Sequence, residues 1–102
     1  MAKYVYVYTG GQMAQTPEAQ EQAMQEWGSW FGTLGAKVVE MGNPFGASAT
    51  VKPGGTAQGG SSALGGYSVI QAGSLDEATA SAAGCPVLKS GGTVEVYEAV
   101  EM

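Results

Sequence analysis

The chain has 102 residues, of which 44% are hydrophobic and only 13% are charged, and it contains neither arginine nor histidine. This length suits one modest core, so we expect a single domain over residues 1–102. The net charge of −5 argues against nucleic acid and anionic membranes as partners, because both are bound through basic surfaces.

Residue usage also limits the cofactors and the compartment. The single cysteine, Cys85, cannot form a disulfide within the chain, and without histidine a structural zinc site is nearly excluded. A metal site built only from carboxylates stays possible but has no support in the spacing of the acidic residues. We therefore expect no metal and no cofactor. The start of the chain lacks the apolar segment of a signal peptide, and no apolar run reaches the roughly 18 residues of a membrane span. These features predict a cytoplasmic protein.

The first predicted element is a strand over residues 3–8, with the sequence KYVYVY. Side chains alternate along a strand, so Tyr4, Tyr6 and Tyr8 share one face and the two valines between them share the other. We expect the valine face to pack in the core. The tyrosine face would then need another cover, because its rings are apolar and its hydroxyls need partners.

A long helix is predicted over residues 17–34. Thr16 is a suitable N-cap, proline is favoured in the first turn, and apolar residues recur every three or four positions. Gly35 would end the helix. Gly28 and Gly32 lie inside it, where each costs about 1 kcal/mol relative to alanine. Either another backbone or a ligand approaches that helix face closely, or the weakness is simply tolerated.

Three short strands are predicted next. Residues 36–42 and 47–52 have strand-like patterns, and between them a turn at 42–46 places asparagine before proline. Residues 53–66 contain six glycines, which indicates a flexible loop. Residues 67–72, with the sequence YSVIQA, form the next strand.

The remaining elements are a helix and a strand. Ser74 followed by Glu77 three residues later is a capping box, which predicts a helix over residues 75–83. A glycine and a proline just beyond it prevent the helix from continuing. Residues 93–100 alternate in character and predict the last strand.

This order of elements predicts an α+β fold of the ferredoxin-like type, an antiparallel sheet with two helices on one face and an extra piece. The last strand would place Val94 and Val96 toward the helices. Glu95 and Tyr97 would then lie on the opposite face, beside the tyrosines of the first strand. Exposed apolar patches of that size mark interfaces, and the simplest cover is a second copy of the same sheet, related by a two-fold axis.

Several stretches resemble the YCII-related (DGPF-domain) family. The similar stretches are KYVYVYTG, the helix with Trp27 and Trp30, the glycine pair of GGYSVIQA, the SLDEA helix start, the CP pair after that helix and the final GTVEV strand. The resemblance spans nearly the whole chain and implies a dimeric α+β barrel of ferredoxin-like subunits. Some members carry a histidine and an aspartate proposed as an acid–base pair. This chain has no histidine and reads KPGGTAQ where the family has its DGPF loop.

Catalytic candidates are few. Glu40 and Glu95 lie on predicted strands, where a carboxylate beside tyrosines in a dimer cavity would have a raised pKa and act as a base. The alternative is an exposed or tyrosine-bonded carboxylate. Cys85 follows a helix C-terminus, which disfavours a thiolate, so we expect a buried small hydrophobe. Asp76 and Glu77 are interpreted as capping residues. The stretch GGTAQGGSS lacks the lysine of a phosphate-binding loop.

An aromatic cleft between helix and sheet is the main binding candidate, because it would suit a flat apolar molecule. The candidate ligand-binding residues are Tyr6, Tyr8, Trp27, Trp30, Phe45, Tyr67 and Tyr97. We therefore expect a homodimer that binds a small, mostly apolar molecule. The alternatives are a cofactor-free enzyme of monooxygenase or isomerase type, using a strand carboxylate and tyrosines, and a structural partner of another protein.

Overall fold

The computed structural model describes residues 2–10, 15–59 and 64–101, and these form six strands and two α-helices. The strands are β1 (Ala2–Thr9), β2 (Val38–Glu40), β3 (Ala49–Lys52), β4 (Gly55–Gln58), β5 (Leu64–Ala72) and β6 (Thr93–Ala99). The helices are α1 (Pro17–Leu34) and α2 (Leu75–Ala82), with short 3-10 helices η1 (Gly35–Lys37) and η2 (Pro86–Ser90). No helix within the described ranges has the length and apolar character needed to cross a membrane.

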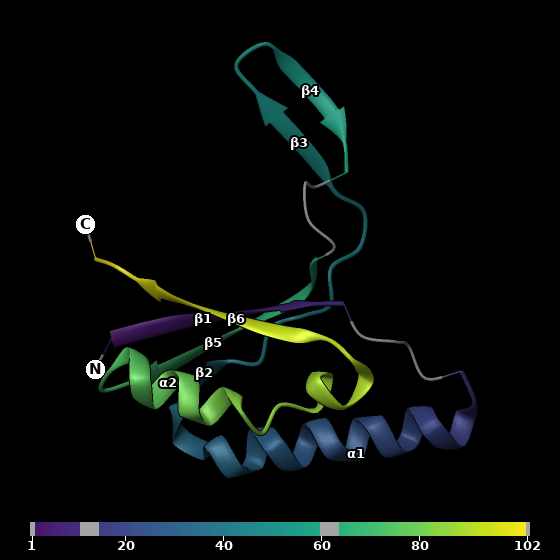
Figure 1. The fold of residues 1–102 in the computed structure, drawn as a ribbon, viewed down its shortest axis with the longest axis vertical. Coiled ribbons are helices and arrows are strands. Elements are labelled where there is room, and N and C mark those ends of the chain that lie inside the picture. Colours follow the sequence, from purple (N-terminus) through teal and green to yellow (C-terminus); the bar gives the residue numbers. More distant parts are fainter. Residues whose placement is uncertain (1, 11–14, 60–63, 102) are drawn as a thin grey trace.

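The main sheet confirms the predicted fold class. Its four strands are antiparallel in the order β2-β5-β1-β6. Both α-helices lie on one side of this sheet (Figure 1). Without β3 and β4 the element order is β-α-β-β-α-β, the ferredoxin-like plan. The extra piece is a separate two-stranded hairpin formed by β3 and β4.

The face of β1 that meets the helices is the tyrosine face, so the predicted orientation of this strand is wrong. Tyr4, Tyr6 and Tyr8 are all buried. The Tyr6 hydroxyl donates to the Ala78 carbonyl of α2 at 2.5 Å, and its ring stacks on Trp30 with 5.9 Å between centroids. These contacts supply the cover and the hydroxyl partners that we expected from a second copy.

The opposite side of the sheet, which carries Val5, Val7, Val69 and Tyr97, is the open face. Cross-strand register places Val5 beside Val69 and Tyr97, and Val7 beside Tyr67 and Glu95. The valines that we expected in the core are therefore only half-buried on the open face. The expected division of β6 is confirmed, because Val94 and Val96 pair with Tyr8 and Tyr6 and pack against the core, with Glu95 and Tyr97 on the other side.

The predicted loop over residues 53–66 is wrong in part. Residues 55–58 form β4, which pairs with β3 through four residue pairs from Ala49–Gln58 to Lys52–Gly55. Gly55 has φ of +145°, which explains a glycine at the start of β4. Residues 60–63 lie outside the described residues, and β5 begins at Leu64. Figure 1 shows the β3–β4 hairpin projecting from the sheet on the side away from α1 and α2.

Both α-helices begin where the capping signals predict. The Thr16 side chain accepts a hydrogen bond from the Ala19 N–H at 3.1 Å, and Gly35 caps the other end of α1 with φ of +57°. In α2 the Ser74 hydroxyl accepts from the Glu77 N–H at 3.1 Å. These local bonds explain why the predicted bounds agree with the observed ones within one residue.

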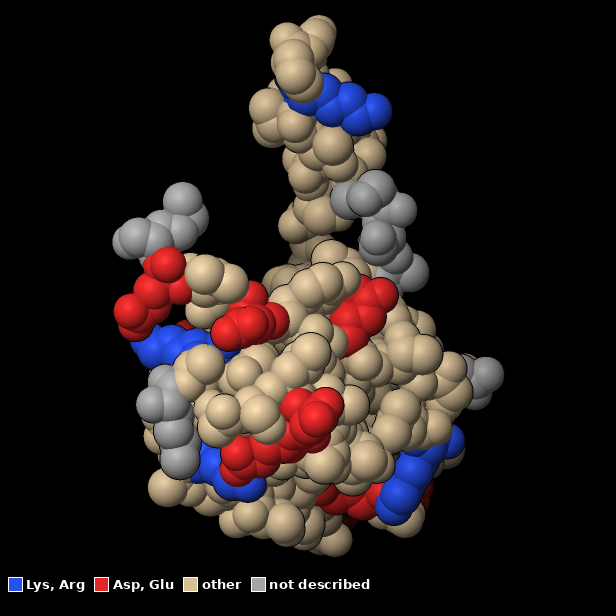
Figure 2. All heavy atoms as spheres, turned by 60° about the vertical axis from the view of Figure 1, so that its left-hand side comes forward, with Lys and Arg blue, Asp and Glu red and all other residues tan. Residues whose placement is uncertain are grey.

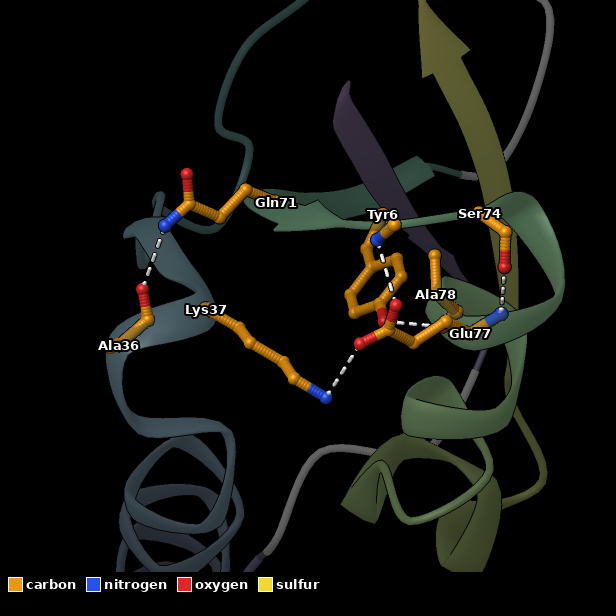
Figure 3. A network of polar contacts seen from close by, with 8 residues as sticks. Tyr6, Ala36, Lys37, Gln71, Ser74, Glu77 and Ala78 are labelled. Atoms are coloured by element: carbon orange, nitrogen blue, oxygen red, sulfur yellow. Dashed lines mark hydrogen bonds and ion pairs between the residues drawn. The ribbon is translucent and has the colours of Figure 1, made fainter. Parts of the chain in front are cut away.

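Figure 3 shows how α2 is tied to the segment before β2. The Glu77 carboxylate accepts from the Gly73 N–H at 2.7 Å and forms an ion pair with Lys37 at 3.1 Å. The Gln71 side chain donates to the Ala36 carbonyl at 3.1 Å (Figure 3). The hydrogen bond from Gly73 is the main cause that lowers the pKa of Glu77.

The two glycines within α1 meet no close neighbour among the described residues. A Cβ atom built on Gly28 or Gly32 has no contact within 4 Å, and both positions are exposed. Nothing described within this chain therefore requires glycine at either position.

Candidate functional site

A cavity of about 920 Å³ opens between the middle of α1, the end of β1 and the segment that leads from β2 toward β3. Five aromatic residues contribute to its lining, and they are Tyr8, Trp27, Phe31, Phe45 and Tyr67. The lining also includes Ala23, Met41, Gly42, Gly66 and Ser68. Apolar, partly enclosed sites of this size are typical of small-molecule binding.

One wall of the cavity comes from α1 and β1. Trp27 and Phe31 are four residues apart, so they project from the same side of the helix. The Trp27 ring meets the Tyr8 ring edge-on with 5.1 Å between centroids, and it lies 6.0 Å from Phe31. Because Tyr8 faces the helices, the corrected orientation of β1 brings it into this wall.

The opposite wall is the turn at residues 42–46, which is fastened to β5. The Phe45 N–H donates to the Gly65 carbonyl at 2.9 Å, and the Tyr67 N–H donates to the Asn43 carbonyl at 3.3 Å. Pro44 and Gly66 form an isolated antiparallel bridge. These contacts hold the Phe45 ring in a stack on Tyr67, with 5.7 Å between centroids and 16° between planes.

Glycine is required where this turn crosses β5. Gly42 has φ of +77°, and a Cβ atom there would lie 1.8 Å from the Tyr67 carbonyl oxygen. A Cβ atom on Gly66 would lie 3.0 Å from the Asn43 carbonyl oxygen. The glycine pair that precedes the YSVIQA strand therefore permits the close crossing that builds the cavity wall.

Two hydroxyl groups from lining residues form a short hydrogen-bonded chain. Ser68 donates to the Met41 carbonyl at 2.6 Å, and Tyr8 donates to the Ser68 oxygen at 2.7 Å. The Ser68 proton is committed to a carbonyl, so the Tyr8 proton must point toward Ser68. Burial is the main cause that raises the pKa of Tyr8 above its usual value, and this keeps the chain neutral. Unused lone pairs, not free protons, remain on both oxygens.

The structure brings together four of the seven predicted ligand-binding residues. Tyr8, Trp27, Phe45 and Tyr67 line the cavity. Tyr6 and Trp30 lie in the core beneath α2, where the Trp30 Nε1–H donates to the Ser81 carbonyl at 3.1 Å. Tyr97 lies on the open face, away from this cavity.

Sequence reasoning did not name Phe31, Ser68 or Met41 among the lining residues. Phe31 lies one helical turn after Trp27, and this spacing was a usable signal. Ser68 and Met41 carried no signal, because their contact depends on the pairing of β5 with the segment after β2.

The two carboxylates proposed as bases are exposed and bonded to tyrosines. Tyr67 donates to Glu40 at 2.7 Å, and Tyr97 donates to Glu95 at 2.6 Å. These hydrogen bonds are the first causes that raise the pKa of each tyrosine. Neither carboxylate lines the cavity. Both lie on the open face, one near each edge of the sheet.

The remaining candidate groups have structural settings. Cys85 is buried, and burial raises the pKa of its thiol to about 11, as expected for a small hydrophobe. Glu77 is held by the contacts of the α2 cap, and Asp76 lies beside it in the first turn. Within residues 2–10, 15–59 and 64–101, no three cysteine or acidic side chains come together in a way that would hold a metal ion.

The topology and the cavity together define a small α+β protein of ferredoxin-like plan with an aromatic site between helix and sheet. A family model for the YCII-related domain matches residues 3–102. The chain therefore belongs to the YCII-related domain family, in agreement with the resemblance seen in its motifs. A search of curated proteins finds no match to the chain.

Proposed function

We propose that this protein binds a small, mostly apolar molecule in the aromatic cavity and acts as a cytoplasmic homodimer. The observation that carries the proposal is a cavity of about 920 Å³ whose lining includes five aromatic residues, of which Tyr8, Trp27 and Phe31 lie on the helix side of the sheet. Among the lining residues in the described ranges there is no acidic, basic or cysteine side chain. This lining favours an uncharged ligand.

The Tyr8–Ser68–Met41 chain favours a ligand that donates a hydrogen bond. Both hydroxyl protons are engaged inside the protein and Ser68 is fully buried, so a bound molecule would meet only the lone pairs of the Tyr8 oxygen. A flat aromatic molecule with one N–H or O–H group matches this arrangement. One such neutral hydrogen bond contributes about 1 kcal/mol, or roughly a fivefold change in Kd.

The open face supports the homodimer. Val5, Val7 and Val69 are half-buried there, and Tyr97 is 54% exposed. A patch of this character rimmed by polar groups is typical of a protein interface. The family implies pairing through sheets, and an identical face on a second copy would cover it by a two-fold axis.

A cofactor-free enzyme is the second candidate, favoured by one contact. Tyr67 lines the cavity, and its hydroxyl donates to Glu40 at 2.7 Å. The pair could carry a proton between the cavity rim and water. In such an enzyme, Glu40→Gln would abolish turnover of a bound substrate and leave the affinity for that substrate unchanged. A protein that only binds its ligand would show no turnover with or without the substitution.

Two probes that differ in one donor test the binding proposal. Indole has an N–H group, and 1-methylindole has the same ring without it. We expect both to shift the amide and Trp27 indole resonances around the cavity in NMR titrations, with indole binding about fivefold more tightly. Tyr8→Phe should remove that preference without closing the cavity.

A matched pair of substitutions on α1 provides the control. Ala23 lines the cavity, and Ala19 is an exposed residue one turn earlier that does not. Ala23→Phe should fill the cavity and prevent probe binding, while Ala19→Phe should leave it unchanged. Shifts that are absent for both probes, or that survive Ala23→Phe, would refute binding at this cavity.

A further inference from the structure

The β3–β4 hairpin makes little use of the rest of its own chain. Seven of its eight strand residues are exposed, and Val51 is 79% exposed. Its base is closed by the Thr50 hydroxyl, which donates to the Gly59 carbonyl at 2.6 Å, and by the Gly59 N–H, which donates to the Ser48 carbonyl at 2.9 Å. A lone two-stranded hairpin is only marginally stable in water, so this one needs cover from elsewhere.

The position of the hairpin limits what can provide that cover. The hairpin projects on the side of the main sheet opposite α1 and α2 (Figure 1), which is also the side of the open face. A molecule that sits on Val5, Val7 and Val69 therefore lies beside the hairpin. One partner would cover both surfaces.

The charges of the hairpin and the body are complementary. Lys52 is the only charged residue between Glu40 and Asp76, so the hairpin is basic in a chain with a net charge of −5. Figure 2 shows basic atoms on the projecting hairpin and acidic side chains gathered on the body below it. By their strand register, Glu40 and Glu95 lie on the open face. Lys52 has no ion pair among the described contacts.

We infer that the β3–β4 hairpin is an arm that packs against a second copy of this chain and brings Lys52 to that copy's acidic surface. Because the basic arm and the acidic open face belong to one chain, a two-fold axis lets each copy use both at once. Lys52 also offsets part of the repulsion between two chains of like charge. The inference rests on the proposed homodimer and specifies which segment holds it together.

Sedimentation velocity over a range of micromolar concentrations tests the arm. We expect wild-type protein to dimerise and Lys52→Glu to raise the dimer Kd about tenfold, with a steeper loss at low salt. Val51→Asp should weaken the dimer similarly, because it places a charge on the apolar arm. Lys89→Glu is the matched control: it makes the same charge change beside Glu26 of α1, on the helix side, and should change Kd less than about twofold.

The outcomes separate the arm from the dimer itself. Replacing residues 49–58 by a short glycine–serine linker should also weaken the dimer, and circular dichroism reports whether the sheet and helices remain. If the Lys52→Glu and Val51→Asp proteins dimerise with the wild-type Kd, the hairpin does not pack against the second copy, and the proposed homodimer still stands. If wild-type protein is monomeric throughout, both are wrong, while indole binding still tests the cavity independently.

Discussion

Gly42→Ala tests the crossing that forms the cavity wall. Gly42 has φ of +77°, and a Cβ atom at this position would lie 1.8 Å from the Tyr67 carbonyl oxygen and 2.7 Å from its carbonyl carbon. Both neighbours are backbone atoms of β5, so no side-chain rotation can relieve the contact. The turn would have to move, which would break the hydrogen bonds at Asn43 and Phe45.

The expected loss of stability has two parts. Placing alanine in the left-handed region costs about 1–2 kcal/mol. Forcing one extra carbon into a packed backbone crossing costs about 1–3 kcal/mol. The sum, roughly 2–5 kcal/mol, is a large share of the 5–15 kcal/mol that holds a domain of this kind folded.

Urea unfolding followed by circular dichroism measures this loss. Gly46→Ala is the control within the same turn, because nothing lies within 4 Å of its built Cβ atom and its φ is not in the left-handed region. We expect Gly46→Ala to change the free energy of unfolding by less than about 0.5 kcal/mol. Equal stabilities of the Gly42→Ala and Gly46→Ala proteins would show that the turn does not cross β5 as described.

Four further outcomes follow from the same structure. Gly28→Ala and Gly32→Ala should each raise the free energy of unfolding by up to about 1 kcal/mol in urea titrations, and a loss would reveal a close neighbour on that face. Cys85, with its thiol pKa raised to about 11 by burial, should react with Ellman's reagent far more slowly in native than in unfolded protein at neutral pH. Burial raises the pKa of Tyr6 from 10.0 to about 12. The stability that its buried neutral hydroxyl contributes is therefore complete below pH 10 and is lost as pH rises through 12. Tyr6→Phe should flatten this part of the curve of unfolding free energy against pH. The pKa of Glu77 is lowered from 4.5, so its contribution is present above that pH and is lost on acidification, and Glu77→Gln should remove the acid-side slope.

Elements with local signals were predictable from the sequence. The Thr16 cap, the proline after it and Gly35 define α1, and each acts through contacts within a few residues of the chain. The same holds for Ser74 at the start of α2. A strand was predicted at the position of β3, but β4 was missed because its glycines indicated a loop, whereas Gly55 with its positive φ begins a strand.

The orientation of β1 was not predictable from alternation, which shows which residues share a face but not which face is buried. The tyrosine face is buried because its neighbours are small. Tyr8 and Tyr6 lie beside Gly66 and Ser68 on β5, and the buried residues of α2 are Ala78 and Ala82. Large rings over small residues fill a core as well as valines over larger ones would. The glycines and alanines of the C-terminal half were therefore the signal that the tyrosines pack beneath the helices.

This correction changes which surface a second copy would cover in the proposed homodimer. If the tyrosines had faced outward, the dimer would have needed partners for three buried hydroxyls. The open face instead presents Val5, Val7 and Val69 between two tyrosine–glutamate pairs whose hydroxyls are already bonded. In the proposed homodimer the tyrosine hydroxyls of this face would keep their partners, so association would rest on apolar area and on the charge that Lys52 brings. A dimer held in this way should weaken when Val7 is replaced by lysine and should be insensitive to Tyr4→Phe. Equal weakening by both substitutions would mean that the tyrosine face contacts the partner.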